Sequence, residues 1–381
     1  MAFCQVIVEQ AAFVWYNKHK FKGAGENMIN RIEKLRKSFD SLEVDAILIT
    51  SQTNHRYFTK FDNGDGCLLI TRKNAYAFED FRYTEIANKL LSGVYTVIQL
   101  KGKRSDWLGN VVKDESIKTI GIEDYSMSIS NFASLKNDLP FVEFKNIGAT
   151  ISLLRQVKDE WEIEQIRKAQ EITDLAFEHI LGIISTEITE TDVAAELEYF
   201  MRKHGAEDKS FETISISAEK TSLPHGVPEN IKIKKGFFTM DFGATVNGYH
   251  ADMTRTISIG KADDEMKKLY NTVLKAQLAS LEYLKAGVVC RDADNIAREI
   301  INKDYNGLFG HSLGHSVGLE IHEVPCLAPT FDKILVPNNV VTVEPGIYMA
   351  GKYGCRIEDL VVIKENGIEN LTKSPKELIE L

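Results

Sequence analysis

Five residues in the last third of the chain have side chains suited to binding metal ions. They are four carboxylates and one imidazole, each in a segment typical of a strand or tight loop: Asp241, Asp252, His315, Glu344 and Glu358. Four carboxylates gathered without a cation would repel one another, and some would become protonated. Two divalent ions relieve that repulsion and can turn bound water into a nucleophile near neutral pH. Because oxygen-rich ligation with one imidazole suits Mn, Co, Fe or Zn, the sequence predicts a two-metal hydrolase.

Asp241 and Asp252 flank an Asn-Gly pair at 247–248. This pair is the strongest short signal for a two-residue hairpin turn. With that turn, Asp241 faces Thr254 and Asp252 faces Gly243, so the two aspartates become diagonal neighbours about 7–8 Å apart on one sheet face. The alternative is a pair of surface aspartates near a turn. Their apolar neighbours favour the buried arrangement.

Three histidines, His311, His315 and His322, lie in one glycine-containing stretch. A single histidine is more often a packed or surface residue than a ligand. Glycines allow a backbone to approach a ligand closely, so the grouping favours a metal and substrate pocket. His225 lies in a turn flanked by prolines, where a surface-loop position is an equal alternative.

Glu344 ends an apolar run, and Pro345 after it favours an extended backbone. Glu358 is embedded in an apolar segment that we expect to be a strand over 354–363. An acidic residue in a buried strand needs a cation or a strong partner. The alternative for Glu358 is an ion pair with Arg356 on an exposed face.

Composition limits the class of protein. The chain has 381 residues with 44% hydrophobic residues, enough for a large core and two domains. A net charge of −9 argues against nucleic acid or an anionic membrane as the main partner. Apolar stretches are too short to span a bilayer. The five cysteines are scattered without CxxC spacing, which favours reduced, buried thiols in a cytoplasmic protein.

The chain is expected to have a leader and two domains. The apolar run 11–16 makes a poor secretory signal, so residues 1–27 are interpreted as an extraneous or poorly ordered leader, or as a surface amphipathic helix. Residues 28–154 alternate strands and helices, which indicates an α/β domain with a mixed or parallel sheet. Its strands are expected at 45–50, 67–71, 75–78, 95–100 and 119–122.

The pattern changes near residue 155, where the second domain, 155–381, is expected to begin. Asp159 is predicted to cap a long helix that continues to Leu181. A second helix is expected over 192–204 with Thr191 as its cap. Strands are expected over 237–244 and 249–257, on either side of the hairpin turn.

Six ordered motifs resemble those of the pita-bread metallopeptidases, most closely the Xaa-Pro branch of prolidase and aminopeptidase P. They are Pro224-His225-Gly226, Asp241-Phe242-Gly243-Ala244, Asp252-Met253-Thr254-Arg255, His315 through Pro325, Glu344-Pro345-Gly346 and Arg356-Ile357-Glu358-Asp359. The resemblance begins near Met28 and loosely includes the segment 80–83. One departure is Ser316, where the family usually has glycine. Another is the pair Lys220-Thr221, where many relatives carry asparagine and serine.

The resemblance implies an α+β pita-bread catalytic domain preceded by an α/β creatinase-like domain. It implies hydrolysis of the Xaa-Pro bond at the N-terminus of dipeptides or short peptides, through a metal-bridging hydroxide. Asp252 and Glu358 would bridge two divalent ions, Mn²⁺ first and Co²⁺ or Zn²⁺ as alternatives, with Asp241 on one ion and His315 and Glu344 on the other.

The resemblance also implies roles for residues around the metals. Glu344 would handle the proton of the nucleophile, and His225 and His322 would contact the substrate or its oxyanion. Arg356 would orient Glu358 or substrate, and His311 would form a wall of the proline pocket. We expect a cytoplasmic homodimer.

Three other functions occur among proteins of this fold. Methionine aminopeptidases share the five ligands but usually lack the N-terminal domain and the Arg-Ile-Glu-Asp motif at 356–359. Creatinase has the same fold and works without metals, so a complete ligand set argues against it. Some members of the fold are non-catalytic interaction modules whose metal site has decayed, whereas all five ligands are present here.

Overall fold

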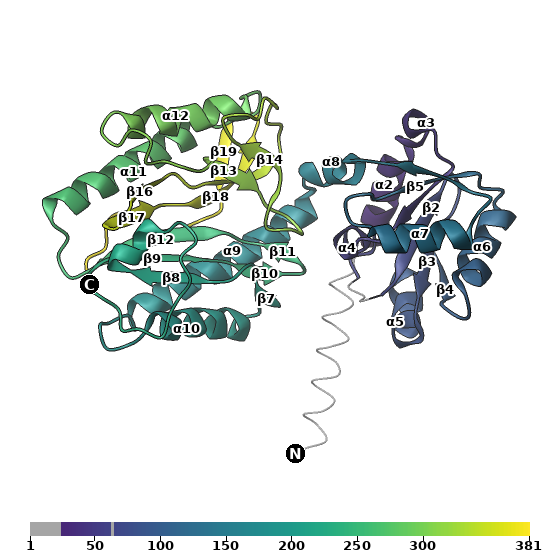
Figure 1. The fold of residues 1–381 in the computed structure, drawn as a ribbon, viewed down its shortest axis with the longest axis horizontal. Helices are drawn as coiled ribbons and strands as arrows, with labels where there is room; N and C mark the ends of the chain where they lie inside the picture. Colours follow the sequence, from purple (N-terminus) through teal and green to yellow (C-terminus); the bar gives the residue numbers. More distant parts are fainter. Residues whose placement is uncertain (1–23, 62–64) are drawn as a thin grey trace, which may run out of the picture. The chain divides into compact units, whose positions relative to one another are not determined.

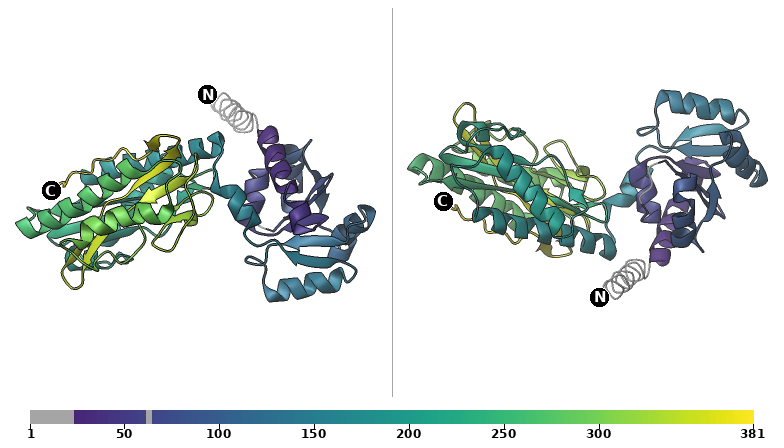
Figure 2. Two further views of the ribbon diagram at one scale, coloured as in Figure 1. Left: turned by 90° about the horizontal axis from the view of Figure 1, so that it is seen from above. Right: turned by 90° about the horizontal axis from the view of Figure 1, so that it is seen from below.

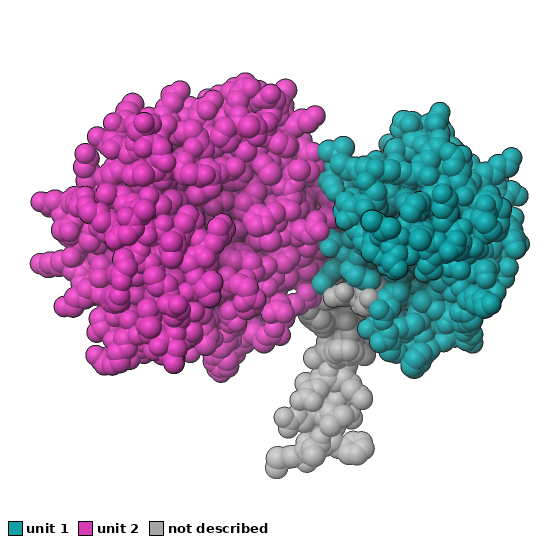
Figure 3. Space-filling model, viewed as in Figure 1, with its two compact units in different colours: residues 1–154 teal, residues 155–381 magenta. Residues whose placement is uncertain are grey.

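The structure, a computed structural model, describes residues 24–61 and 65–381 (Figure 1, with two further views in Figure 2). The chain forms two compact units, residues 1–154 and 155–381 (Figure 3). The predicted leader lies mainly within residues 1–23, which are outside the described residues. Cys4 is outside them too. The first described helix, α2 (Ala24–Arg36), begins before Met28, where the sequence pattern put the start of the first domain.

The first unit is built on a six-stranded mixed sheet with the order β4-β3-β2-β1-β5-β6. β2 is antiparallel to β1 and β3, and the other neighbours are parallel. The strands are β1 (Ala46–Ile49), β2 (Cys67–Thr71), β3 (Ala75–Glu79), β4 (Thr96–Gln99), β5 (Thr119–Ile122) and β6 (Glu143–Asn146). The first five confirm the sequence prediction. The edge strand β6 was missed because none of its side chains is buried, so it lacks an apolar pattern.

Helices pack on this sheet and cover its apolar side chains. They are α3 (Phe39–Leu42), α4 (Gln52–Thr59), α5 (Phe81–Leu91), α6 (Arg104–Asp114) and α7 (Ile129–Asp138), and α8 (Thr150–Gln156) spans the division between the units. Leu108 and Val112 of α6 are buried with Leu48 and Ile120 of the sheet. The first unit therefore has a hydrophobic core of its own.

The helices of the second unit begin with α9 (Glu160–Leu181), capped as predicted by Asp159. Asp159 accepts from the amide of Glu162, whose side chain accepts in return from the Asp159 amide. The predicted cap of the next helix, α10 (Glu190–Lys203), was wrong. Thr189 is the cap because its side chain accepts from the amide of Asp192, and Thr191 lies inside the first turn.

The remaining helices are α11 (Asp264–Tyr283) and α12 (Cys290–Asn302), with the 3₁₀ turn η1 (Ala218–Ser222). The pair α11 and α12 covers one side of the strands, and α9 and α10 cover the other (Figure 2). Among the described residues, no helix is both long and apolar enough to cross a membrane.

The strands between these helix pairs form several small sheets. Their orders are β12-β9-β8, β11-β10-β7, β14-β13-β15-β18-β19 and β16-β17. The bounds are β7 (Asp208–Lys209), β8 (Ile214–Ser217), β9 (Gly236–Phe242), β10 (Ala244–Val246), β11 (Tyr249–His250), β12 (Met253–Ile259), β13 (Gly314–Ser316), β14 (Glu323–Leu327), β15 (Val340–Val343), β16 (Gly346–Met349), β17 (Tyr353–Arg356), β18 (Asp359–Lys364) and β19 (Gly367–Asn370).

Candidate metal centre

The hairpin that carries the two aspartates has the predicted register. Asn247 and Gly248 have positive φ values of 50° and 80°, and Asp241 pairs with Thr254. The two expected strands are each divided, because the ribbon changes from one sheet to another between β9 and β10 and between β11 and β12. At this change a Cβ on Gly243 would lie 1.9 Å from the carbonyl oxygen of Ala251. Glycine therefore lets the two backbones approach beside Asp252.

Three of the carboxylates lie where one strand ends and another begins. Asp252 precedes β12, Glu344 lies between β15 and β16, and Glu358 lies between β17 and β18. The expected continuous strand over 354–363 was thus wrong at Glu358, whose amide donates to the Thr254 carbonyl at 3.1 Å. All three carboxylates line one cavity.

The predicted ligands come together in one pocket. Single ligand atoms of Asp252, His315 and Glu358 all lie within 4.8 Å of one another. His315 Nε2 is 3.5 Å from Asp252 Oδ2 and 3.4 Å from Glu344 Oε1. Asp241 lines the same cavity, which has a volume of about 590 Å³.

The carboxylates repel one another in the absence of a cation. Burial, followed by repulsion from Glu358, Asp241 and Glu344, raises the pKa of Asp252. Burial and the charges of Glu344 and Asp241 raise the pKa of Glu358. Burial raises the pKa of Glu344 to about 8. This cluster is therefore poorly suited to carrying four negative charges by itself.

Two buried carboxylate oxygens, Asp241 Oδ1 and Glu358 Oε1, have no hydrogen-bond partner among the described residues. Unpaired buried polar atoms are rare and call for an explanation such as an ion. A cation bound here would satisfy both oxygens and remove the repulsion. The residues therefore fit the divalent ions that their chemistry predicts.

The imidazole of His315 directs Nε2 toward the candidate carboxylate ligands. Its Nδ1 lies 3.2 Å from the Ser316 carbonyl, which can only accept, so Nδ1 carries the proton. Burial, then the nearby His322, lowers the pKa of His315 to about 4. The ring is therefore neutral at pH 7, with the Nε2 lone pair facing Asp252 and Glu344.

Arg356 is paired with Asp241, one of the candidate ligands, and not with Glu358. Its Nη2 donates to Asp241 Oδ2 at 2.6 Å, and its Nε donates to Thr254 Oγ1 at 2.9 Å. Thr254 Oγ1 donates in turn to Glu358 Oε2 at 2.7 Å. Arg356 and Glu358 are both buried, so an exposed Arg356–Glu358 pair is ruled out.

His311 is held in a chain of hydrogen bonds that ends at Arg356. Arg356 Nη1 donates to the Tyr348 oxygen at 2.8 Å, and the Tyr348 hydroxyl lies 2.9 Å from His311 Nε2. His311 Nδ1 lies 2.9 Å from the Ser312 carbonyl, so it carries the proton, and Tyr348 donates to Nε2. Burial, then the charge of Arg356, lowers the pKa of His311 to about 4, consistent with a neutral ring.

The other two histidines also line the cavity. The ring centroids of His322 and His315 are 4.4 Å apart, and the two ring planes make an angle of 69°. His225 lines the cavity beside Pro224, whose carbonyl accepts from Arg356 at 3.3 Å. The sequence-predicted site residues are therefore all found around one cavity.

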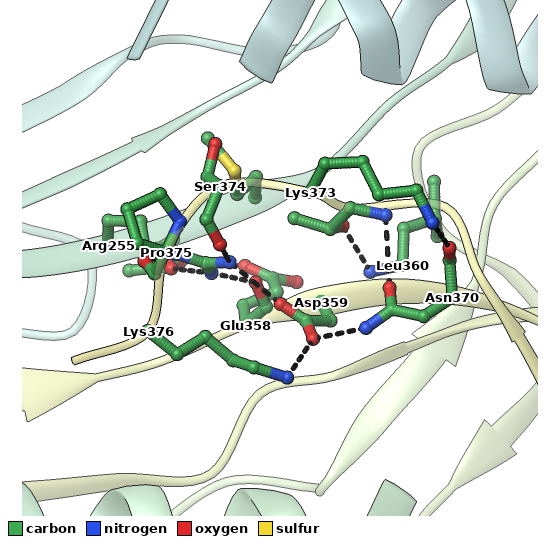
Figure 4. A network of polar contacts seen from close by, with 12 residues as sticks. Arg255, Glu358, Asp359, Leu360, Asn370, Lys373, Ser374, Pro375 and Lys376 are labelled. Atoms are coloured by element: carbon green, nitrogen blue, oxygen red, sulfur yellow. Dashed lines mark hydrogen bonds and ion pairs between the residues drawn. The ribbon is translucent and has the colours of Figure 1, made fainter. Parts of the chain in front are cut away.

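A buried ion pair supports the strand start next to Glu358 (Figure 4). Arg255 Nη2 donates to Asp359 Oδ1 at 2.8 Å, and Arg255 Nη1 donates to the Glu358 carbonyl. Lys376 and Asn370 donate to the other Asp359 oxygen at 2.7 and 2.6 Å. Arg255 and Asp359 belong to the motifs that carry Asp252 and Glu358, so the pair joins two ligand segments.

Sequence reasoning missed three hydroxyl groups of the site, those of Thr254, Thr342 and Tyr348. Thr342 accepts from the His315 amide at 3.0 Å and donates to Glu344 Oε1 at 3.2 Å. Thr254 lies two residues after Asp252, and Thr342 lies two residues before Glu344. Their position beside a candidate ligand is the only sequence signal for them. Their partners depend on how distant segments pack.

The four described cysteines, Cys67, Cys290, Cys326 and Cys355, are free thiols. Cys290 and Cys355 are buried as expected, whereas Cys67 and Cys326 are only partly buried. Cys326 lines the cavity and pairs with His315 in the β13–β14 ladder.

Family models match both units. The model described as metallopeptidase family M24 matches residues 164–365, and the model described as creatinase/prolidase N-terminal domain matches residues 31–157. The chain belongs to metallopeptidase family M24. The predicted creatinase-like domain followed by a pita-bread catalytic domain is thereby confirmed, and so is membership of a metal-dependent peptidase family.

Three relatives cover nearly the whole chain. A structure described as an Xaa-Pro dipeptidase from Bacillus anthracis is 43% identical, with a TM-score of 0.91 over 93% of this chain and 100% of that one. An X-Pro aminopeptidase from Thermotoga maritima is 40% identical, with a TM-score of 0.86 over 91% and 100%. An Xaa-Pro dipeptidase of Pyrococcus furiosus is 37% identical over 92% of this chain and 100% of its own length.

Proposed function

We propose that this protein is a dinuclear-metal peptidase that hydrolyses the Xaa-Pro bond at the N-terminus of dipeptides or short peptides. The supporting observation is the buried convergence of Asp252, His315 and Glu358 within 4.8 Å, beside two carboxylate oxygens that lack partners. The substrate class is supported by relatives described as Xaa-Pro dipeptidases and as an X-Pro aminopeptidase.

The proposed centre holds two divalent ions, Mn²⁺ in preference to Co²⁺ or Zn²⁺. Asp252 and Glu358 would be shared between the ions, with Asp241 holding one of them and His315 and Glu344 holding the other. When bound, such a pair offsets the carboxylate charges, polarises the scissile carbonyl and makes hydroxide available near neutral pH. The short distances from His315 Nε2 to Asp252 and Glu344 agree with this division of ligands.

The surrounding residues take the remaining roles. Glu344, with a raised pKa, is the group that handles the proton of the attacking nucleophile. His225 and His322 contact the substrate or its developing oxyanion, and donors of that kind contribute about 100- to 1,000-fold in rate. His311, fixed by Tyr348, is a wall of the proline pocket, and Arg356 orients Asp241 directly and Glu358 through Thr254.

The proposal includes the organisation of the molecule. Residues 155–381 form the catalytic domain, and the domain before it, expected over 28–154, also includes the start of α2 at Ala24. The enzyme is a cytoplasmic homodimer whose partners are proline-containing peptides and neither nucleic acid nor membrane.

Substrate class is tested with protein reconstituted with Mn²⁺. Turnover of Met-Pro, Met-Pro-Ala and Met-Ala is compared, with chelated protein as the blank. A bond before proline lacks the N–H that general peptidases bind, so it needs a dedicated site. We expect both proline peptides to be cleaved faster than Met-Ala, and the tripeptide separates aminopeptidase from dipeptidase activity. Faster cleavage of Met-Ala would favour a methionine aminopeptidase.

Metal content is tested with Glu358→Ala, using Glu365→Ala in the exposed turn between β18 and β19 as the matched control. We expect Glu358→Ala to lose bound metal and activity together, whereas the control keeps both. Full activity of thoroughly chelated wild-type protein would exclude the metal mechanism.

A further inference from the structure

Ser316 follows His315 on β13, and its side chain is fully buried. Its Oγ accepts a hydrogen bond from Lys158 Nζ at 2.8 Å, and the Lys158 side chain is only 1% exposed. A buried ammonium group must have polar partners, because the loss of hydration is costly. Ser316 is therefore one of the groups that make the buried position of Lys158 tolerable.

Ser316 and Lys158 belong to a larger group, the Lys158 cluster: Arg155, Lys158, Ser316, Glu320 and Glu323. Glu323 accepts from Lys158 on Oε2 at 3.2 Å and from Arg155 on Oε1. Arg155 also donates to Glu320 at 2.6 Å. Burial alone would raise the pKa of Glu323, but Lys158 and Arg155 outweigh it and lower the pKa. The cluster is therefore a set of paired charges that is buried except at Glu320, whose side chain is 50% exposed.

Members of the cluster lie at both ends of segment 316–323, which carries His322. Ser316 and Glu323 are opposite each other in the β13–β14 ladder, and the register shifts between His315 and Ser316. Gly318 leaves room for the Glu323 carboxylate, since a Cβ there would lie 2.6 Å from it. The cluster therefore joins the two ends of this segment beside His315.

A Lys–Ser pair at 2.8 Å also has the geometry of a base and its nucleophile. Such a nucleophile must reach the substrate. Ser316 is fully buried and is not among the described residues that line the cavity. The geometry thus favours a role in positioning over a role in bond cleavage.

We propose that Ser316 is a positioning residue. Its hydroxyl ties the Lys158 cluster to the strand of His315, and so holds His315 Nε2 and the His322 ring at their spacing in the metal centre. The inference rests on the proposed function in so far as that function needs a metal at His315. It assigns a purpose to the serine at a position where the family resemblance leads one to expect glycine.

The experiment measures Mn²⁺ affinity by titration calorimetry on the chelated full-length chain. The variants are Ser316→Ala, Lys158→Met and the double variant. The control, Ser280→Ala, removes another buried hydroxyl, one that donates to the Ala276 carbonyl within α11. Loss of a group that orients a metal ligand typically weakens metal affinity about 10- to 100-fold. We expect that range for Ser316→Ala and wild-type affinity for the control.

The double variant tests whether the hydroxyl acts through Lys158. We expect Ser316→Ala to add nothing in the Lys158→Met background, because groups in one network are not additive. Wild-type affinity in Ser316→Ala, or fully additive losses, would overturn the proposal. Ser316→Cys keeps the shape of the side chain, is somewhat larger and has only a weak acceptor, and it replaces the alanine variant if that variant does not fold. Mn²⁺ binding is measured without substrate, so a failed Xaa-Pro assay leaves this comparison intact.

Discussion

Hydroxyl groups connect the proposed metal ligands to one another and to Arg356. Thr254 links Arg356 to Glu358, and Thr342 links the His315 amide to Glu344. A hydroxyl can accept from one group and donate to the next, so each threonine fixes the direction in which a carboxylate presents its remaining lone pairs.

Thr254→Val tests this function, because valine has nearly the same shape and no hydroxyl. The variant leaves Arg356 Nε and Glu358 Oε2 without this partner, so we expect Mn²⁺ affinity to fall by about 10- to 100-fold. Calorimetric titration of the chelated protein measures the change. Thr272→Val, which removes a hydroxyl bonded only within α11, is the control. Equal affinity in the two variants would contradict the role given to Thr254.

The raised carboxylate pKa values predict how metal-free protein responds to pH. In the unfolded chain Asp and Glu ionise near pH 4, whereas the pKa of Glu344 is about 8 and those of Asp252 and Glu358 are also raised. Between these pH values the folded state binds more protons than the unfolded state. The free energy of unfolding therefore falls as pH rises, by about 1.4 kcal/mol per pH unit for each extra proton.

Urea unfolding with a chelator at several pH values from 5 to 8 measures this slope. Saturating Mn²⁺ should abolish it, because bound carboxylates are already ionised. Glu344→Gln should reduce it in the chelated protein. If stability without metal did not decrease over this range, the carboxylates would not carry the raised pKa values.

The convergence of the candidate ligands on one cavity could be predicted from sequence, because carboxylates among apolar strand residues are conspicuous. Asp252 and Glu358 stand out from their own apolar sequence neighbours, without knowledge of any tertiary contact. Thr254, Tyr348 and Lys158 could not be singled out in this way, since strand threonines and surface lysines are common. Their importance comes from contacts between segments more than a hundred residues apart for Thr254–Glu358 and Lys158–Ser316.

At the scale of elements, α12 holds the loop that carries His311. Asp294 Oδ1 accepts from the Leu313 amide at 2.9 Å and pairs with Arg298. Arg298 also donates to the carbonyls of Phe309 and His311, each at 2.8 Å. Asp294 thereby fixes the loop both directly, through Leu313, and indirectly, through Arg298.

Arg298→Met should loosen this loop while keeping much of the side-chain packing. Misplaced contact residues can lower kcat/KM by about 100-fold, and we expect a loss of at least tenfold here. Faster hydrogen exchange at 309–313 would accompany it. Arg291→Met on the same helix removes exposed pairs with Asp292 and Asp332, both away from the loop, and serves as the control. Unchanged exchange in Arg298→Met would show that other contacts hold the loop.

Elements with a local signal were predictable from the sequence. The Asn-Gly turn at 247–248 determined a register that runs to Asp241 and Thr254, and Asp159 with Glu162 marked the start of α9. The cap of α10 was misassigned because Thr189 and Thr191 are both suitable residues two positions apart. The break at Glu358 depends on its amide bonding to Thr254, a contact that has no local signature.

At the scale of the whole molecule, each unit has a core of its own, and every proposed ligand lies in residues 155–381. Mn²⁺ should therefore stabilise this unit in particular. Ligand at 100 times its Kd contributes about 2.7 kcal/mol. Hydrogen exchange with and without Mn²⁺ should show added protection mainly in β9, β12, β13 and β18. If Mn²⁺ added the same protection to residues 46–146 of the first unit, the two units would unfold together.

The close approach at Gly243 has a consequence for recognising inactive relatives. A methyl group at this position would overlap the Ala251 carbonyl oxygen, so any side chain would push apart the backbones that set Asp252. A homologous chain could thus retain all five ligand types and still have lost the centre through a change at a residue that binds nothing. Surveys that sort active enzymes from decayed ones should count this glycine together with the ligands.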